Sequence, residues 1–246
     1  MAAAAEAAGF DVFGFSSHAM LPDSLDFTLS AKTIPEYVSK IRAVAAEYAG
    51  RMEIRCGVEA DYVPGRSVPD RSAYAAYGLD YIIGSVHFVC APDGALVPVD
   101  HTPELLSRGV AEHFGGSAEA FVRAYFAAER EMAGRFDFDI VGHPDLVRKF
   151  NVRHPFFDEG ARWYLDEVER TAEALALSGK TVEVNVGAIS RGWLDDAYPS
   201  EGFRKLLAGR GVRLVYASDA HSVAGVDCAY GRFAPDCASA ARDRRG

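Results

Sequence analysis

A short apolar run ends in a histidine at Tyr81-Ile-Ile-Gly-Ser-Val-His87. The same arrangement recurs in Val12-Phe-Gly-Phe-Ser-Ser-His18, Asp139-Ile-Val-Gly-His143 and Leu214-Val-Tyr-Ala-Ser-Asp-Ala-His221, and Glu59 follows Ile54-Arg-Cys-Gly-Val58 in the same way. Apolar runs of this length are typical of strands that are buried on both faces of a parallel sheet. The sequence therefore predicts several parallel strands, each followed by an imidazole or a carboxylate.

Helical periodicity occupies the segments between these strands. The predicted helices cover 34–49, 118–134, 157–178 and 200–210, and the predicted strands cover 12–15, 53–58, 81–85, 139–142, 181–185 and 213–217. This alternation is typical of α/β folds, whose right-handed crossovers curl the sheet toward a barrel. The segment 90–116 contains a Pro-Asp-Gly turn and is expected to be a long functional loop.

Both ends of the chain depart from a closed barrel. Residues 1–8 have the pattern of a helix that ends at Gly9, although a strand should precede such a helix in a βα repeat. Apolar periodicity is lost after Asp227. We expect a distorted (β/α)7 TIM-like barrel that is incomplete and lacks its first strand, with one domain at 1–227 and an irregular tail at 228–246. We expect that the chain is a fragment of a longer protein, or that its ends result from a wrong start codon or a shifted reading frame. Natural variation of the termini is the alternative.

The charge and the hydropathy of the sequence indicate whether the protein binds nucleic acids or membranes. The chain has 246 residues, of which 25% are charged, and its net charge is -9. We expect no nucleic-acid partner, because phosphate backbones attract basic surfaces. The sequence has no apolar run of about 18 residues and no basic start of a signal peptide, so we expect a cytoplasmic protein without a membrane span. Four cysteines, Cys56, Cys90, Cys228 and Cys237, are expected to be buried thiols, with disulfides or zinc ligation as the alternative.

The residues that follow the strands predict a metal site. In parallel α/β folds the carboxyl ends of the strands meet on one face, where active sites form. Imidazole and carboxylate are the ligands that zinc, manganese and iron share. The candidate ligands are His18, Glu59, His87, His143, Asp219 and His221. Each of them alone could be a capping or loop residue, but their recurrence after separate strands favours a common site. For His101, His113 and His154 we keep the loop interpretation.

Six segments together resemble the polymerase-and-histidinol-phosphatase (PHP) family, and within it the monofunctional histidinol-phosphatases. They are Phe15-Ser-Ser-His18-Ala, Gly57-Val-Glu59-Ala-Asp61-Tyr, Ile83-Gly-Ser-Val-His87, Val141-Gly-His143-Pro-Asp145-Leu, Glu183-Val-Asn185 and Ser218-Asp-Ala-His221-Ser. The resemblance covers about residues 1–227. It implies a distorted barrel that holds two or three divalent metal ions, zinc, manganese or iron. The family pattern begins with His-x-His on the first strand, which this sequence lacks.

The resemblance also implies roles for the ligands. Glu59 would bridge two metals, with Asp219 on the first of them, which makes these two carboxylates the expected catalytic residues. His87 and His143 would hold the second metal, and His18 and His221 would share a third.

The implied reaction is hydrolysis of a phosphate monoester, L-histidinol phosphate, by a metal-activated water. Arg191 is the first candidate for binding the phosphate, because guanidinium matches phosphate in a bidentate fork, and Lys149 and Arg153 are further candidates. Asp145 is predicted to orient His143. The candidate contacts for the imidazole and amine of the substrate are Asp61, Tyr62, Trp193 and Tyr198, although Trp193 and Tyr198 could equally be core residues.

Other functions remain open at this stage. Another phosphoester could be the substrate, or the site could be that of an amidohydrolase. The amidohydrolase hypothesis is weakened because none of the lysines, Lys32, Lys40, Lys149, Lys180 and Lys205, ends a predicted strand. A metal-binding fragment without turnover is the third possibility.

Overall fold

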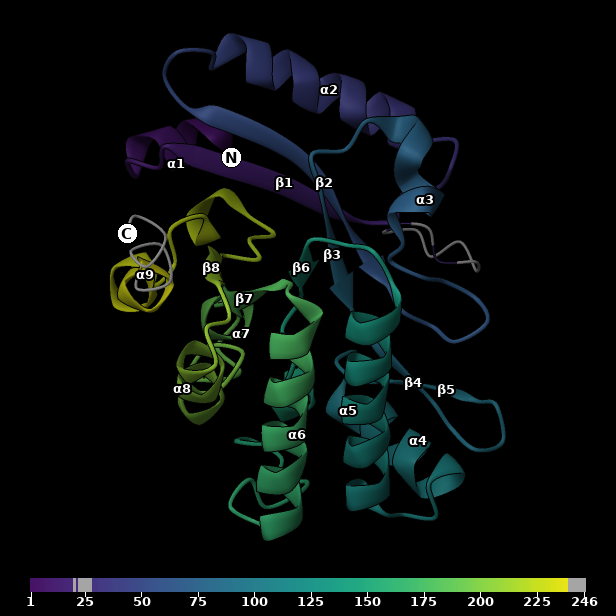
Figure 1. The fold of residues 1–246 in the computed structure, drawn as a ribbon. Helices are drawn as coiled ribbons and strands as arrows, with labels where there is room; N and C mark the ends of the chain where they lie inside the picture. Colours follow the sequence, from purple (N-terminus) through teal and green to yellow (C-terminus); the bar gives the residue numbers. More distant parts are fainter. Residues whose placement is uncertain (20, 22–27, 239–246) are drawn as a thin grey trace.

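A parallel six-stranded sheet forms the centre of the molecule (Figure 1). The structure, a computed structural model, describes residues 1–19, 21 and 28–238. The strand order is β1-β2-β3-β6-β7-β8, and every neighbouring pair is parallel. The strands are β1 Val12–Ala19, β2 Glu53–Asp61, β3 Tyr81–Ser85, β6 Ile140–Val141, β7 Thr181–Asn185 and β8 Leu214–Ala217. Within the described residues β1 and β8 are the edges of this sheet, which confirms the expected incomplete TIM-like α/β barrel.

Burial explains why these segments form strands. The second half of β2 is buried on both faces, and in β7 the residues after Thr181 are buried as well. Such strands need apolar residues on both sides, as Val182 and Val184 provide. The edge strand β1 is more exposed, and only its last residue, Ala19, is buried.

Helices cover the sheet and the ends of its strands (Figure 1). The longer helices are α1 Ala2–Ala7, α2 Ile34–Glu47, α4 Pro103–His113, α5 Ala118–Arg135, α6 Arg162–Ser178, α8 Glu201–Gly209 and α9 Tyr230–Ala238. The short ones are α3 Arg71–Tyr74 and α7 Gly187–Ser190, with 3-10 turns η1 Ala75–Tyr77, η2 Leu146–Arg148 and η3 Val223–Gly225. Helix α5 packs on α6, α6 packs on α8, and α2 packs on β2. None of the helices in the described part of the chain combines the length and the apolar character that crossing a membrane requires.

Two apolar clusters hold these layers together. The larger one lies between the sheet and helices α5, α6 and α8, and it includes the fully buried Phe121, Phe126, Leu175 and Phe203. The smaller one joins α1, α2 and the first two strands through Ala5, Ile41, Tyr48, Ile54 and Cys56. Burial of each large apolar side chain stabilises the fold by about 1.5–3 kcal/mol. All four cysteines are free thiols, but only Cys56 is buried as expected, since Cys228 and Cys237 are half-buried and Cys90 is exposed.

The expected long loop at 90–116 is instead a hairpin followed by a helix. Strands β4 Phe88–Cys90 and β5 Leu96–Pro98 pair in antiparallel fashion. Gly94 in the connecting turn has φ 86, a value that favours glycine. Helix α4 follows, and the Thr102 hydroxyl caps it by accepting from the Leu105 N–H. The loop prediction was wrong because three-residue strands are too short to show a periodicity in sequence.

Two further boundaries differ from expectation. Helix α6 begins at Arg162 rather than at 157, because the Asn151 side chain accepts from the backbone N–H groups of Phe156 and Phe157 and holds them in a turn. Residues 230–238 form α9 where we expected an irregular tail. The contact of α9 with β8 and the burial of Phe233 stabilise a helix whose own sequence is a weak signal, since it contains Pro235. The rest of the expected tail, 239–246, lies outside the described residues.

Candidate metal centre

Glu59 lies at the middle of a buried cluster of histidines. Its Oε1 lies 3.0 Å from His143 Nε2 and 3.5 Å from His87 Nε2, and its Oε2 lies 3.4 Å from His18 Nδ1. The Ser85 hydroxyl donates to Oε1 at 2.7 Å. One carboxylate therefore faces three imidazoles that come from different parts of the sheet.

The sheet register explains why these residues meet. His18 of β1 is the direct neighbour of Glu59 in β2. Asp61, two residues further along β2, is the neighbour of Ser85 at the end of β3. His87 and His143 follow β3 and β6, which are also neighbours. Because all these strands are parallel, their carboxyl ends deliver the side chains to one edge.

The carboxylates and imidazoles of this cluster shift one another's pKa toward the charged forms. Burial alone would raise the pKa of Glu59, but the imidazoles of His18, His143 and His87 lower it well below its usual value. Burial lowers the pKa of His87, yet the Asp61 carboxylate raises it well above the usual value. Burial likewise opposes a charged His143, whose hydrogen bond to Glu59 raises its pKa to about 8. The cluster therefore favours positive charge beside two buried carboxylates, which is what a divalent cation provides.

The donor atoms fit a metal ion. Two groups have ligand atoms within 4.8 Å of one another: Glu59 with His87 and His143, and His18 with Asp61 and His87. Ligands about 2.1 Å from one ion lie up to about 4.2 Å apart, so atoms grouped this closely can become ligands of one ion after small movements of their side chains. Nitrogen and oxygen donors of this kind suit zinc, manganese and iron.

Neighbouring side chains fix the ligands, and sequence reasoning missed most of them. Asp61 Oδ1 lies 2.6 Å from His87 Nδ1, and the side chain is only 2% exposed, so it orients His87 and is not open to a substrate. Glu183 Oε1 accepts from the His143 backbone N–H at 2.9 Å and from Asn185 Nδ2. A charged residue inside the otherwise apolar run of β7 was the available signal for Glu183.

Asp145 does not contact the His143 side chain in this structure, contrary to its predicted role. Its Oδ2 accepts from the Ser200 backbone N–H at 2.8 Å and lies 3.4 Å from Arg148 Nη1. Asp145 thus ties the segment after β6 to the start of α8. The two residues are separated by Pro144, so closeness in sequence was a poor guide to contact.

Asp219, His221 and Arg191 form a second group on the same rim. Arg191 Nη2 donates to Asp219 Oδ2 at 2.8 Å, and Nη1 lies 3.2 Å from His221 Nδ1. The rings of His18 and His221 have centroids 6.4 Å apart, which links this group to the cluster around Glu59. A side chain at Gly187 would collide with Asp219 Oδ2 and with the Arg191 guanidinium, so only glycine leaves room for the pair.

The other predicted basic residues lie beside the rim with partners of their own. Lys149 Nζ donates to Asp100 Oδ2 at 2.9 Å and to the Asp100 carbonyl at 2.8 Å. The Arg153 guanidinium lies over the Trp193 ring, 5.4 Å from its centroid.

Two of the candidate substrate contacts, Tyr62 and Tyr198, lie in the core, and a third, Trp193, is only partly exposed. Tyr62 and Tyr198 are 2% and 1% exposed and belong to the core. Trp193 is half-buried, and its ring packs edge-on against Phe150. Aromatic residues close to a site in sequence are more often core residues, because they bury much apolar area.

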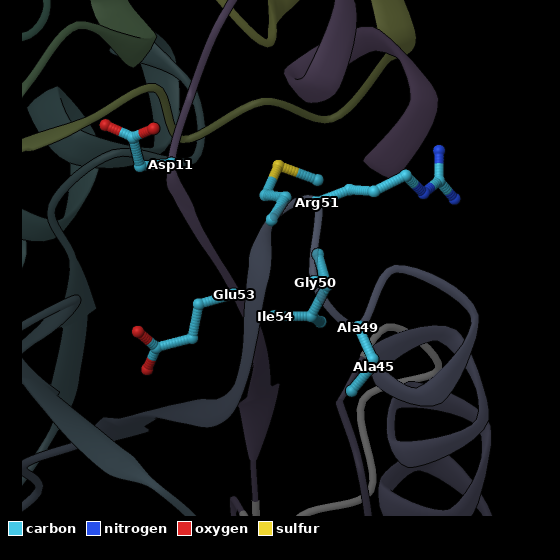
Figure 2. Close-up of a pocket in the computed structure, with 8 residues that line it drawn as sticks. Asp11, Ala45, Ala49, Gly50, Arg51, Glu53 and Ile54 are labelled. Carbon is cyan, nitrogen blue, oxygen red and sulfur yellow. The ribbon is translucent and has the colours of Figure 1, made fainter.

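A surface hollow of about 470 Å³ lies at the other end of the first two strands (Figure 2). Asp11, just before β1, and Glu53, the first residue of β2, line it together with Arg51. The charges of Glu53 and Arg51 are paired with Arg55 and Glu6, respectively. This hollow has none of the clustered ligands found at the carboxyl ends of the strands.

Comparisons with known proteins agree with this geometry. The family model described as "PHP domain" matches residues 1–187. The probable histidinol-phosphatase of Deinococcus radiodurans is 31% identical over 227 residues, which are 89% of this chain and 78% of the relative. The histidinol-phosphatase of Bacillus subtilis is 26% identical over 93% of this chain and 88% of its own length.

Solved structures show the same fold. A structure from Listeria monocytogenes that carries a histidinol phosphatase name has a TM-score of 0.84 at 21% identity, over 95% of this chain and 92% of the other. A histidinol phosphate phosphatase from Lactococcus lactis, solved with zinc, L-histidinol and phosphate, has a TM-score of 0.67 at 20% identity, over 96% and 85% of the two chains. The family match covers most of the chain, the relatives extend over nearly all of it, and the strand ends carry the expected ligands. The chain therefore belongs to the PHP domain family.

Proposed function

We propose that this chain is a metal-dependent phosphatase that converts L-histidinol phosphate and water to L-histidinol and phosphate. The observation that carries the proposal is the convergence of His18, His87 and His143 on the Glu59 carboxylate. The names of the relatives, and the zinc, L-histidinol and phosphate in the Lactococcus lactis structure, supply the substrate.

Two or three metals would be held by the residues around Glu59. We assign one metal to Glu59, His87 and His143, whose ligand atoms already lie together. His18, Asp219 and His221 would serve neighbouring metals on the same rim. A bound divalent metal supplies an activated water and neutralises the phosphoryl oxygens. The part of Glu59 is to present one oxygen to each side of the cluster, since Oε1 faces His143 and Oε2 faces His18.

Arg191 is the residue that we propose for binding the phosphate. Its guanidinium already holds an anion, the Asp219 carboxylate, and its side chain is 33% exposed. A phosphate dianion on the rim offers the same pairing of oxygens. Lys149, which is paired with Asp100, and Arg153, whose guanidinium lies over Trp193, would add further positive charge for binding the phosphate.

Asp100 is the residue that we propose for the cationic end of the substrate. Its side chain is 28% exposed, and Lys149 Nζ holds it in place. Burial raises the pKa of Asp100, but the charge of His87, the charge and hydrogen bond of Lys149 and the charge of His143 together lower it to about 2. An anionic side chain there can accept from an amine or an imidazole of the substrate.

The test is release of phosphate from L-histidinol phosphate by the full chain with manganese or zinc. A phosphate monoester without cationic groups serves as the second substrate. Asp100→Asn should raise KM for L-histidinol phosphate several-fold and leave KM for the second ester unchanged, whereas Arg191→Met should impair both. Turnover of an amide in place of the phosphate esters would favour an amidohydrolase. Zinc binding without any turnover would point to a metal-binding fragment.

A further inference from the structure

Nearly every polar atom of His143 has a hydrogen-bond partner. Its backbone N–H donates to Glu183 Oε1 at 2.9 Å, and its carbonyl lies 3.1 Å from the Tyr125 hydroxyl. Its Nε2 faces Glu59 Oε1 at 3.0 Å. Nδ1 is fully buried and has no hydrogen-bond partner. A buried ring nitrogen that carries a proton destabilises the fold if it is left without an acceptor, so Nδ1 requires one.

His87 shows what such an acceptor does in this site. Its Nε2 faces Glu59 Oε1, and its Nδ1 lies 2.6 Å from Asp61 Oδ1. An imidazole that binds a metal commonly donates its other ring N–H to a carboxylate, which fixes the ring and the position of the proton. The Nε2 of His143 also faces Glu59 Oε1, at 3.0 Å. By analogy with Asp61, a carboxylate should accept the proton of His143 Nδ1.

Several buried side-chain atoms have no hydrogen-bond partner. Within the described residues these atoms are Glu129 Oε2, His143 Nδ1, Asp145 Oδ1, Tyr164 OH and Tyr198 OH. Two of them, Glu129 Oε2 and Asp145 Oδ1, are carboxylate oxygens that could accept from His143 Nδ1. After burial, the charge of Arg148 has the largest effect on the pKa of Asp145, whereas the charges of His143 and His87 act on the pKa of Glu129, which favours Glu129 as the acceptor.

Glu129 and His143 share a hydrogen-bond partner, Tyr125. The Tyr125 hydroxyl lies 2.7 Å from Glu129 Oε1 and 3.1 Å from the His143 carbonyl, so both residues touch the same oxygen atom. Burial raises the pKa of Glu129 to about 8, against the hydrogen bond from Tyr125 and the charge of His143, which both lower it. The carboxylate is 0% exposed and lies on the inner face of α5.

We infer that Glu129 is the positioning residue of His143, its Oε2 accepting the Nδ1–H through one ordered water. Nε2 is then the nitrogen left for Glu59 and for the metal, as it is in His87. This inference rests on the proposed metal centre and adds to it a residue that contacts neither metal nor substrate. Helix α5, which the sequence predicts only as a covering helix, thereby becomes part of the site.

The first test needs no variant. The zinc-loaded full chain, labelled with ¹⁵N-histidine, is studied by long-range ¹H–¹⁵N correlation, and the His143 signals are assigned from their loss in His143→Asn. We expect the proton of the His143 ring on Nδ1 and zinc on Nε2. A proton on Nε2, with Nδ1 bare or bound to zinc, would overturn the inference.

The second test compares two buried glutamates. Glu129→Gln should weaken zinc affinity about tenfold, measured by competition with a chelating dye. Glu167→Gln is the matched control, because Glu167 is also buried but pairs with Arg123 and Arg130 between α5 and α6. It should lower Tm and leave zinc affinity unchanged.

The outcomes separate the two proposals. Equal zinc affinity in Glu129→Gln and the original chain contradicts only the role of Glu129. A chain that binds no zinc at all contradicts the metal centre, and the inference falls with it. If Glu129→Gln does not fold, the position of the His143 proton in the unaltered chain decides.

Discussion

Ser85 shows how closely single residues around the metal centre depend on one another. Its hydroxyl donates to Glu59 Oε1, and its side chain is fully buried. A Cβ at Gly142, in the neighbouring strand end, would collide with the Ser85 hydroxyl oxygen. The glycine before His143 is therefore required by the hydrogen bond that holds Glu59, and a substitution at 142 would act on the metal ligand through Ser85.

Replacing Ser85 isolates this contact. In Ser85→Ala the Glu59 carboxylate loses one fixed hydrogen bond, and we expect zinc affinity to fall about tenfold. The loss in folding free energy should be about 1 kcal/mol. Ser178→Ala removes a hydroxyl that donates to the Leu175 carbonyl at the end of α6 and serves as control. Zinc titration of both variants checks the prediction, and an unchanged affinity in Ser85→Ala would refute it.

At the scale of helices and strands, the sequence was informative where the signal is local. Burial on both faces of a strand leaves an apolar run, and a ligand must follow it directly, so His87 and His143 could be found by pattern alone. The roles of Asp61, Glu183 and Ser85 could not, because each depends on a neighbour from another strand. The hairpin β4–β5 and the helix α9 were missed because short elements are defined by their contacts rather than by periodicity.

Asp80 lies directly before β3 and links it to α2 and β2. Its contribution to stability should depend on pH. Arg42 of α2 donates to its Oδ2 and Oδ1 at 2.6 and 2.8 Å, and the Cys56 N–H of β2 donates at 2.7 Å. The hydrogen bond from Arg42 lowers the pKa of Asp80, with burial acting against it. Since the folded pKa lies below the unfolded value of about 3.9, the stabilisation is present above that pH and is lost as the pH falls through the folded pKa.

Asp80→Asn should therefore cost about 1 kcal/mol of unfolding free energy at pH 7, a small value because the side chain is one-third exposed. The difference from the original chain should shrink at pH 3. Urea unfolding at both pH values measures it. A difference of equal size at pH 3 would show that the charge of Asp80 has no part in stability.

Helix α9 should contribute to the stability of the whole sheet through one aromatic ring. Phe233 is 1% exposed, and the guanidinium groups of Arg204 and Arg232 lie 5.0 and 4.6 Å from the centroid of its ring. Phe233→Ala should cost about 3–5 kcal/mol in unfolding free energy. Val223→Ala, at a side chain that is 59% exposed, should cost less than about 0.5 kcal/mol. Similar midpoints for the two variants would mean that α9 is not docked.

For the molecule as a whole, the metal centre acts as a link between strands. His18 belongs to β1, Glu59 to β2, His87 follows β3 and His143 follows β6. A metal held by these residues joins strands that contribute to both apolar clusters. Binding and folding are then coupled, because the unfolded chain does not hold these ligands together.

Zinc should accordingly raise the thermal stability of the chain. At free zinc about 1,000 times Kd, the stabilisation is about 4 kcal/mol, somewhat less if the unfolded chain also binds zinc. For a domain of this size that corresponds to an increase in Tm of about 8–16 °C, at about 2–4 °C per kcal/mol. Glu59→Gln should abolish the increase. Glu53→Gln, in the same strand but with a side chain that is 56% exposed, should retain it. Scanning calorimetry with zinc and after addition of a chelator measures both, and an equal increase in the two variants would mean that zinc stabilises the chain from somewhere other than Glu59.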